Sequence, residues 1–375
     1  MSGETSTRST GNLIKTPYYD FHVEAGAKMV PFAGFLMPVQ YAGGITAEHI
    51  AVRENVGMFD LSHMGEFEVN GPQALEFLEY TTVNNVSKMN IGQCLYNCMC
   101  LPDGGIVDDL LVYKLPTRFM LVVNASNIEK DFDWLSVQTE GFDVKLTDKS
   151  AETSLLAVQG PNARKVLSEI TDYDLESMKY YSWALAEIAG IDILFSRTGY
   201  TGEDGFELYI APEHADILWN AITEAGKKYD MELIGLGARD SLRLEMKMAL
   251  YGNDIDSTTT PIEAGLSWIV DFEKDFIGKE VLLKQKEEKP TRRLVCLELE
   301  GRVFPRQGYD IYDGAEKIGK LTSGTFSPTL QKPIALGYVP RRLAKSGSTV
   351  EIEIRGKRFT ATVVKPPFYK KASHR

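Results

Sequence analysis

Cysteine and long apolar runs are scarce in this sequence, and both shortages exclude classes of protein. The 375 residues include only four cysteines, Cys94, Cys98, Cys100 and Cys296. So few cysteines do not form the disulfide framework of a small secreted protein, and the C-x3-C-x-C spacing of the first three does not match zinc ligands. We expect reduced thiols packed along one face of a strand. Because no run of about 18 apolar residues occurs, no membrane-spanning helix is expected either.

Basic charge is also in deficit. Lysine and arginine total 41 against 52 acidic residues, and the net charge of −11 argues against broad nucleic-acid binding. The exception is the end of the chain, where Lys365, Lys370, Lys371 and Arg375 have no acidic neighbour. That end is either a solvated tail or a segment folded against the mouth of a site, where it would hold anions.

Signature motifs of several enzyme classes are missing. The sequence contains no GxSxG, HExxH or DxDxDG pattern, so it gives no support for a serine hydrolase, a zinc hydrolase or an EF-hand protein. The composition itself, with 43% hydrophobic and 25% charged residues, is that of an ordinary globular protein with a buried core.

Length and pattern divide the chain into parts. A chain of this length exceeds one ordinary domain. Residues 1–14 are rich in Ser and Thr without the apolar centre of a secretory signal, so a disordered tail is expected there. Residues 15–284 mix helix and strand patterns and predict an α+β body. Residues 285–375 lose the helical pattern and alternate at short spacing, which predicts a small all-β barrel or sandwich. A charged helix over 276–289 is expected to link the two.

The most informative segment is 93–124, which is typical of three strands joined by two tight turns. Asp103-Gly104 is a strong hairpin signal, and a two-residue loop there places Tyr96 opposite Leu111. A second turn at Pro116-Thr117 places Asp109 opposite Asn124. Residues that pair directly, or stand two apart, share a sheet face.

Four polar or aromatic residues are therefore expected on one face of this meander: Tyr96, Asp109, Tyr113 and Asn124. A carboxylate among apolar and aromatic groups is costly unless it is bonded or used. Asp109 is thus a candidate functional residue, and the alternative is an edge carboxylate bonded to Asn124 or to a tyrosine hydroxyl. Its neighbour Asp108 points to the opposite face, where we expect it to be solvated.

Two further segments have the character of a ligand site. Residues 197–207, RTGYTGEDGFE, carry three glycines but fit neither a P-loop nor a dinucleotide fingerprint. Such a loop lets a ligand approach the backbone, and Glu207 follows it as either a ligand carboxylate or an exposed strand residue. In the helical run GLGARDSLRLE, Arg239 and Arg243 share a face. They either form surface ion pairs or grip a carboxylate ligand. His63 is interpreted as a packing residue.

These segments, in this order, resemble the T-protein family of aminomethyltransferases. The matching runs include FDLSHMGEF from Phe59, GGIVDDLLVYK from Gly104, RTGYTGEDGFEL from Arg197, GLGARDSLRLE from Gly235 and ALGYV from Ala335. The resemblance extends over nearly the whole chain from about Thr16. It implies a body of two intertwined, ferredoxin-like folate-binding lobes around a central channel, followed by a C-terminal β-barrel.

The resemblance also implies roles for residues of the site. Asp109 matches the critical aspartate of the family, and tetrahydrofolate is the expected co-substrate, without a metal. The residues expected to bind folate are Met64, Tyr96, Tyr113, Asn124, Tyr200, Glu207, Arg239 and, by a weaker match at the chain end, Arg375. Among these, Glu207 is expected to bind pterin ring nitrogens.

The activity that the resemblance implies is transfer of a methylene carbon. The donor is the aminomethyl group on the lipoyl arm of H-protein, and the products are ammonia, 5,10-methylenetetrahydrofolate and dihydrolipoyl H-protein. Neither nucleic acid nor a membrane is an expected partner. The intact Met1 and the lack of an Arg-rich leader favour the cytoplasm.

Three alternatives remain open. Related demethylases transfer one-carbon units from dimethylated amines or sulfonium compounds, although those linked to oxidases carry a flavin domain for which this chain has no room. Folate-binding proteins of iron–sulfur maturation carry Lys-Gly-Cys in the linker, where this sequence reads KDFIGKEVLL from Lys274. The third is a folate-binding interaction module without enzymatic activity.

Overall fold

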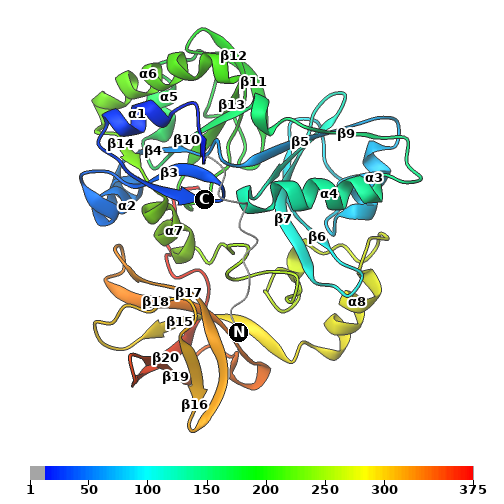
Figure 1. Ribbon diagram of the computed structural model, residues 1–375, viewed down its shortest axis with the longest axis vertical. Helices are drawn as coiled ribbons and strands as arrows, with labels where there is room; N and C mark the ends of the chain where they lie inside the picture. Colours follow the sequence, from blue (N-terminus) through cyan, green and yellow to red (C-terminus); the bar gives the residue numbers. More distant parts are fainter. Residues whose placement is uncertain (1–12, 375) are drawn as a thin grey trace.

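In the computed structural model, which describes residues 13–374, a mixed six-stranded sheet and an antiparallel five-stranded sheet form the upper body, and a closed barrel forms the lower part (Figure 1). The six-stranded sheet has the order β11-β12-β13-β10-β4-β14, and the five-stranded sheet the order β6-β7-β8-β5-β9. A small sheet, β1-β3-β2, adds the N-terminal strands. The predicted α+β body is confirmed.

The strands of the body have the following bounds: β1 Ile14–Lys15, β2 Lys28–Phe32, β3 Phe35–Gln40, β4 Gly57–Asp60, β5 Gly65–Asn70, β6 Cys94–Cys100, β7 Ile106–Lys114, β8 Phe119–Val123, β9 Lys145–Asp148, β10 Ser154–Gln159, β11 Trp183–Ile188, β12 Ile191–Ser196, β13 Gly205–Ile210 and β14 Glu232–Ile234. The helices are α1 Tyr19–Glu24, α2 Gly44–Glu54, α3 Ala74–Thr81, α4 Ile128–Gln138, α5 Ala163–Leu167, α6 Ala215–Gly226, α7 Leu236–Glu245 and α8 Lys279–Glu288.

The two sheets are intertwined along the chain. Strand β4 belongs to the six-stranded sheet, the next five strands build the other sheet, and the chain then returns with β10 to pair beside β4. The six-stranded sheet is therefore built from segments on both sides of this crossing, whereas the five-stranded sheet is built from consecutive strands. The tail expected over residues 1–14 ends earlier than expected, because Ile14 pairs with Phe35; residues 1–12 lie outside the described part of the chain.

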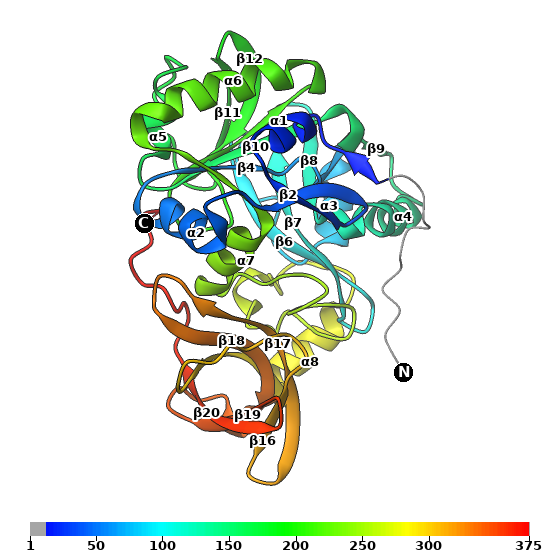
Figure 2. The same ribbon diagram turned by 60° about the vertical axis from the view of Figure 1, so that its left-hand side comes forward.

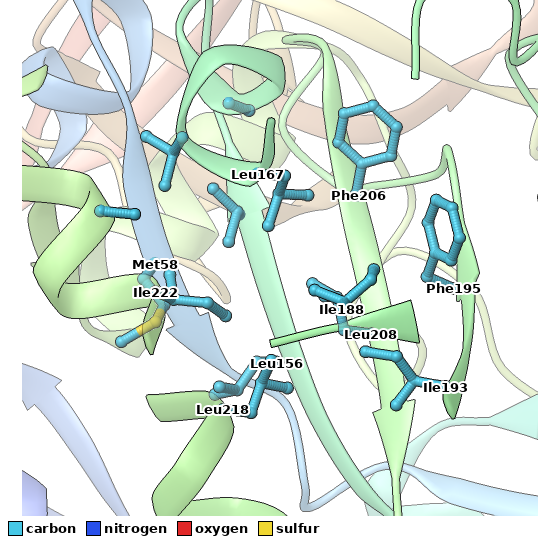
Figure 3. Close-up of a cluster of buried hydrophobic side chains, with 14 of the residues drawn as sticks. Met58, Leu156, Leu167, Ile188, Ile193, Phe195, Phe206, Leu208, Leu218 and Ile222 are labelled. Carbon is cyan, nitrogen blue, oxygen red and sulfur yellow. The ribbon is translucent and has the colours of Figure 1, made fainter. Parts of the chain in front are cut away.

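Each sheet packs its helices on one face. Leu218 and Ile222 of α6 lie against Met58, Leu156 and Leu208 of the six-stranded sheet (Figure 3). The five-stranded sheet buries its other set of alternating residues, including Leu110 and Val112 of β7, with residues of α3 and α4. A third cluster fills the space between the two sheets and contains Tyr113, Val122, Leu155 and Tyr209. The faces left for a ligand are therefore the ones that the sheets turn toward each other.

The C-terminal part is a closed six-stranded antiparallel barrel, as expected. Its strands are β15 Arg292–Leu299, β16 Asp310–Asp313, β17 Glu316–Ser327, β18 Lys332–Pro340, β19 Thr349–Ile354 and β20 Lys357–Val364. Arg355 and Gly356, with φ of 51° and 76°, form the tight turn between β19 and β20, which suits the twist of a hairpin. The domain boundary drawn near residue 285 falls inside α8, and the division of the chain there stays a proposal.

A buried ion network joins the lobes to the barrel. Arg53 of α2 donates to Glu245 of α7 at 3.0 Å and to Glu203 of the glycine-rich loop at 2.8 Å. Ser327 of β17 donates to Glu245 at 2.5 Å. Burial alone would raise the pKa of Glu245, but hydrogen bonding to His49 and the charge of Arg53 outweigh it and lower this pKa to about 2. One guanidinium thus holds three distant segments together.

The end of the chain packs on the same network. In Figure 2 the C-terminal segment rises from the barrel and ends beside α2. The Tyr369 ring lies 4.2 Å from the Arg53 guanidinium, and Ser373 receives a hydrogen bond of 2.9 Å from the Asp204 backbone N–H. The described residues of the chain end are therefore packed through Phe368, Tyr369 and Ala372, whereas Lys365, Lys370 and Lys371 are exposed. A role of this end in holding anions stays a prediction, and Arg375 lies outside the described residues.

Replacing Arg53 tests the network. Arg53→Met leaves Glu203 and Glu245 buried without their cation, so we expect a loss of about 3–5 kcal/mol in the free energy of unfolding, measured by chemical denaturation at pH 7. The deficit should shrink at acid pH, because the variant's carboxyls then take up protons. The free energy of unfolding of the wild type should decrease instead, because the stabilising contribution of ionised Glu245 is lost as the pH falls from about 5 toward 2.

The matched control is Glu54→Gln, an exposed change on the same helix, for which we expect less than about 0.5 kcal/mol. Equal stability of Arg53→Met and the wild type at pH 7 would contradict the role of the network.

Candidate functional site

A cavity of about 510 Å³ lies between the two lobes and is lined from both sheets. Strands β6 and β7 contribute one wall, while the glycine-rich loop, β13 and α7 contribute the other. The predicted site residues that line it are Met64, Tyr96, Asp109, Asn124, Tyr200, Glu207 and Arg239. Residues that are more than 110 positions apart in the sequence, such as Tyr96 and Glu207, therefore meet in one cavity.

The strand register expected for the meander is confirmed. Tyr96 pairs with Leu111, Cys98 with Asp109, and Leu111 with Val122. The first turn differs from the expected two-residue loop, because Leu101 N–H bonds to Gly105 O at 2.7 Å and closes a longer loop. A bulge between Met99 and Cys100 absorbs the difference, so the face of every residue nearer the site is unchanged.

Asp109 is held on both carboxylate oxygens. The Tyr96 hydroxyl donates to Oδ2 at 2.9 Å, and the Asn124 side-chain amide donates to Oδ1 at 2.9 Å. Burial, followed by the negative charge of Asp108, raises the pKa of Asp109 to about 7 against these hydrogen bonds. At neutral pH this carboxyl therefore both accepts and releases a proton, as a general acid–base group requires.

The expectation that Asp108 is solvated was wrong. Asp108 is fully buried, and its carboxylate accepts hydrogen bonds from the Asn124 amide at 2.9 Å and the Asn127 amide at 2.7 Å. Asp131 of α4 lies beside it, and burial together with Asp108 raises the pKa of Asp131 well above its usual value. Helix α4 covers this face of the sheet, which the strand pattern alone does not reveal.

Glu207 and Arg239 form the opposite wall. The Thr198 hydroxyl donates to Glu207 Oε2, and burial raises the pKa of Glu207 while the charge of Arg239 opposes this. The Arg239 guanidinium lies 4.7 Å from the Tyr200 ring and has no side-chain ion pair or hydrogen bond within residues 13–374. Arg243 differs, because it pairs with Asp240 and Asp254. Arg243 thus forms ion pairs, but its side chain is buried and the surface interpretation does not hold for it. Arg239 is a cavity cation that lacks an anionic partner within the described chain.

One of the expected folate residues lies elsewhere. Tyr113 does not line the cavity: it is fully buried between the sheets, and its hydroxyl contacts Ser196 at 3.0 Å and Tyr209 at 2.8 Å. Arg375 lies outside the described residues. His63 packs edge-on against Phe32 at 5.5 Å, and burial lowers its pKa to about 3, so it is neutral.

The sequence patterns missed Lys247, Trp268 and Thr198, which also line the cavity. Trp268 is 71% exposed and stacks on Tyr96 with ring centroids 6.1 Å apart. Lys247 donates to the Ala264 carbonyl at 2.7 Å. Both follow α7 in irregular chain, where no periodic pattern marks a face.

Between residues 13 and 374, no group of three or more His, Cys, Asp or Glu side chains is arranged to hold a metal ion. No helix in that range combines the length and apolar character needed to cross a membrane.

Comparison with known proteins gives the family. Residues 18–274 match the model of the GCVT N-terminal domain, and residues 292–370 match that of the glycine cleavage T-protein C-terminal barrel domain. An aminomethyltransferase of Desulfitobacterium hafniense is 49% identical over 96% of this chain and 99% of its own length. One of Chloroherpeton thalassium is 51% identical over 95% and 99%.

A solved structure agrees with these matches. The crystal structure of glycine cleavage system aminomethyltransferase T from Bartonella henselae superposes with a TM-score of 0.91 at 36% identity, covering 96% of this chain and 99% of that one. Both parts of the chain, and the order in which they occur, are those of this family. The chain therefore belongs to the glycine cleavage T-protein family of aminomethyltransferases.

Proposed function

We propose that this protein transfers the methylene carbon of the aminomethyl group on lipoylated H-protein to tetrahydrofolate. The products are ammonia, 5,10-methylenetetrahydrofolate and dihydrolipoyl H-protein. Family membership supports the transferase activity, and the cavity supports the choice of folate. The cytoplasmic location expected from the sequence stays a prediction.

The residues of the cavity fit a reduced folate. A flat pterin suits the aromatic Tyr200 and the apolar Leu61 and Leu155 that line the same space. Glu207 is a buried acceptor for ring N–H groups. Arg239 is a half-buried cation without an ion-pair partner among the described residues, and it matches the polar or anionic parts of such a ligand. Tetrahydrofolate would supply the amine nitrogens that receive the methylene carbon.

The observation that carries the proposal is Asp109, which has a pKa near 7 and lies between two hydrogen-bond donors on the cavity wall. A carboxyl in this state can remove a proton from an attacking amine nitrogen at neutral pH. In its ionised form it also stabilises positive charge that develops at the carbon being transferred. Tyr96 and Asn124 keep the carboxyl oriented for both tasks.

The alternatives are separated by one assay. The curated relatives match this chain over essentially their whole length, so nothing in it corresponds to an added flavin domain. Methylene transfer from aminomethylated H-protein to tetrahydrofolate is expected here. It is not expected of a demethylase, of a folate-binding protein of iron–sulfur maturation or of a non-enzymatic module. Absence of this transfer with folate bound would reject the proposed reaction.

Asp109→Asn should nearly abolish transfer with the fold intact. The amide can no longer accept a proton, so we expect a fall in kcat on the order of 10²–10⁴. Steady-state kinetics measure the effect, and circular dichroism checks the fold. Asp133→Asn, at an exposed carboxyl on α4, is the matched control and should keep wild-type turnover. Near-normal turnover of Asp109→Asn would remove the assignment.

The pH dependence provides a separate check on Asp109. If its ionised form is the base, kcat/KM should fall as the pH decreases through about 7. Asp108→Asn removes a negative charge that raises this pKa, so the acid limb of the profile should move to lower pH. Tyr96, Asn124, Asp131 and Lys130 are the other polar and charged groups around this pair. An acid limb that does not move in Asp108→Asn would argue against the coupling.

Glu207→Gln and Arg239→Ala should weaken folate binding more than they slow the chemistry. Loss of a charge-assisted contact costs about 1.5–3 kcal/mol, a rise of roughly 10- to 150-fold in the folate Kd. Isothermal titration calorimetry measures the Kd, and Arg118→Ala, which removes a partly exposed arginine paired with Glu68, is the control. Unchanged affinity in both cavity variants would sink this assignment.

A further inference from the structure

Four hydroxyl groups form a continuous hydrogen-bonded chain behind the cavity and end on Glu207. Tyr209 and Tyr113 hydroxyls are 2.8 Å apart, Tyr113 and Ser196 hydroxyls 3.0 Å, and Ser196 and Thr198 hydroxyls 2.6 Å. Thr198 then donates to Glu207 Oε2. All five residues are at least nine-tenths buried, with Glu207 the most exposed at 8%.

The carboxylate at one end sets the direction of every bond in this chain. Ionised Glu207 has no proton to donate, so the Thr198 hydroxyl must donate to it. Thr198 then accepts from Ser196, Ser196 accepts from Tyr113, and Tyr113 accepts from Tyr209. Burial raises the pKa of Glu207, while the hydrogen bond from Thr198 and the charge of Arg239, which faces the same cavity, oppose this and favour the ionised form. The Tyr209 hydroxyl donates at the start of the chain, and each of the other three hydroxyls accepts one hydrogen bond and donates one.

The chain also crosses from one lobe to the other. Tyr113 lies on β7 of the five-stranded sheet, whereas Ser196 and Tyr209 lie on β12 and β13 of the six-stranded sheet. Ser196 pairs directly with Glu207 across these two strands. On β7, Asp109 and Tyr113 share one face and stand four residues apart, about 13 Å along the strand. The Tyr113 hydroxyl therefore ties the strand that carries Asp109 to the strand that carries Glu207.

We propose that Tyr113 and the hydroxyl chain are a positioning relay, which fixes Glu207 relative to Asp109 and keeps Glu207 Oε1 available for an N–H donor of the bound ring. Oε1 accepts no side-chain hydrogen bond within residues 13–374, while Oε2 is committed to Thr198. Tyr113 thus acts through Glu207 without touching the ligand. The inference rests on the proposed function, because it assigns the binding of the folate ring to this carboxylate.

Tyr113→Phe keeps the ring and removes the link between the lobes. We expect a rise of roughly 3- to 10-fold in the tetrahydrofolate Kd by calorimetry, with kcat nearly unchanged. Thr198→Val cuts the chain next to Glu207, so adding Tyr113→Phe to it should cause no further loss. A role in packing alone predicts additive effects in this double-mutant cycle.

Tyr338→Phe is the matched control. It also removes a buried tyrosine hydroxyl, which bonds to the Asp254 carbonyl at 2.9 Å, but it lies on the barrel away from the cavity lining. We expect it to lower stability and to leave the folate Kd unchanged.

Ser196→Ala interrupts the hydroxyl chain through a smaller change than Tyr113→Phe and replaces it if that variant does not fold.

A measurement without ligand separates this inference from the proposed function. Carbon-13 NMR titration of Glu207 in the free protein should give a higher pKa in Tyr113→Phe than in the wild type, because the relay favours the ionised form. The relay would be overturned if Tyr113→Phe left the tetrahydrofolate Kd unchanged and the double-mutant cycle with Thr198→Val were additive. It would also be overturned if the pKa of Glu207 were the same in Tyr113→Phe and in the wild type. A wild-type protein that binds no tetrahydrofolate would overturn the proposed function instead, and the titration would still decide the relay.

Discussion

Strand register in the β6–β7–β8 meander is the constraint on which the site depends. Side chains alternate between faces along a strand, so a shift of one residue would turn Asp109 toward α4 and bring Asp108 to the cavity. The bulge between Met99 and Cys100 matters for this reason. It takes up the extra length of the turn outside the site, and the pairing of Asp109 with Cys98 is preserved.

Two kinds of buried carboxyl coexist in this molecule, and their surroundings separate them. Glu203 and Glu245 lie against Arg53, where a cation and several donors bind both carboxylates. Asp109 and Glu207 lie on a cavity wall with neutral donors, and burial raises the pKa of both. The first pair stabilises the junction of the lobes, the barrel and the chain end. The hydrogen bonds of the second pair do not fully offset the effect of burial on their pKa. This is the expected state of carboxyls that bind a ligand or take part in a reaction.

These two sets of groups are mechanically connected. Glu203 belongs to the same glycine-rich loop that carries Thr198 and Tyr200 into the cavity, and Arg53 holds that loop against α2 and α7. Arg239 projects from α7, the helix whose last residue, Glu245, is bound by Arg53. The network therefore holds together the elements that carry Glu207 and Arg239, and the hydroxyl contacts of Tyr113 tie this wall to the meander.

The sequence by itself determined the features that arise from local rules. Period-two alternation and turn residues were enough to predict the faces of Tyr96, Asp109 and Asn124, and the late hairpin at Arg355-Gly356, because neighbours in a strand constrain one another directly. The motif order was enough to indicate the family. Only the tertiary structure decided that Asp108 is buried, that Tyr113 stands behind the cavity, and that Arg53 joins α2 to the glycine-rich loop and α7. Each of these depends on contacts between segments far apart in the chain, and no local pattern encodes which distant group will cover a given face.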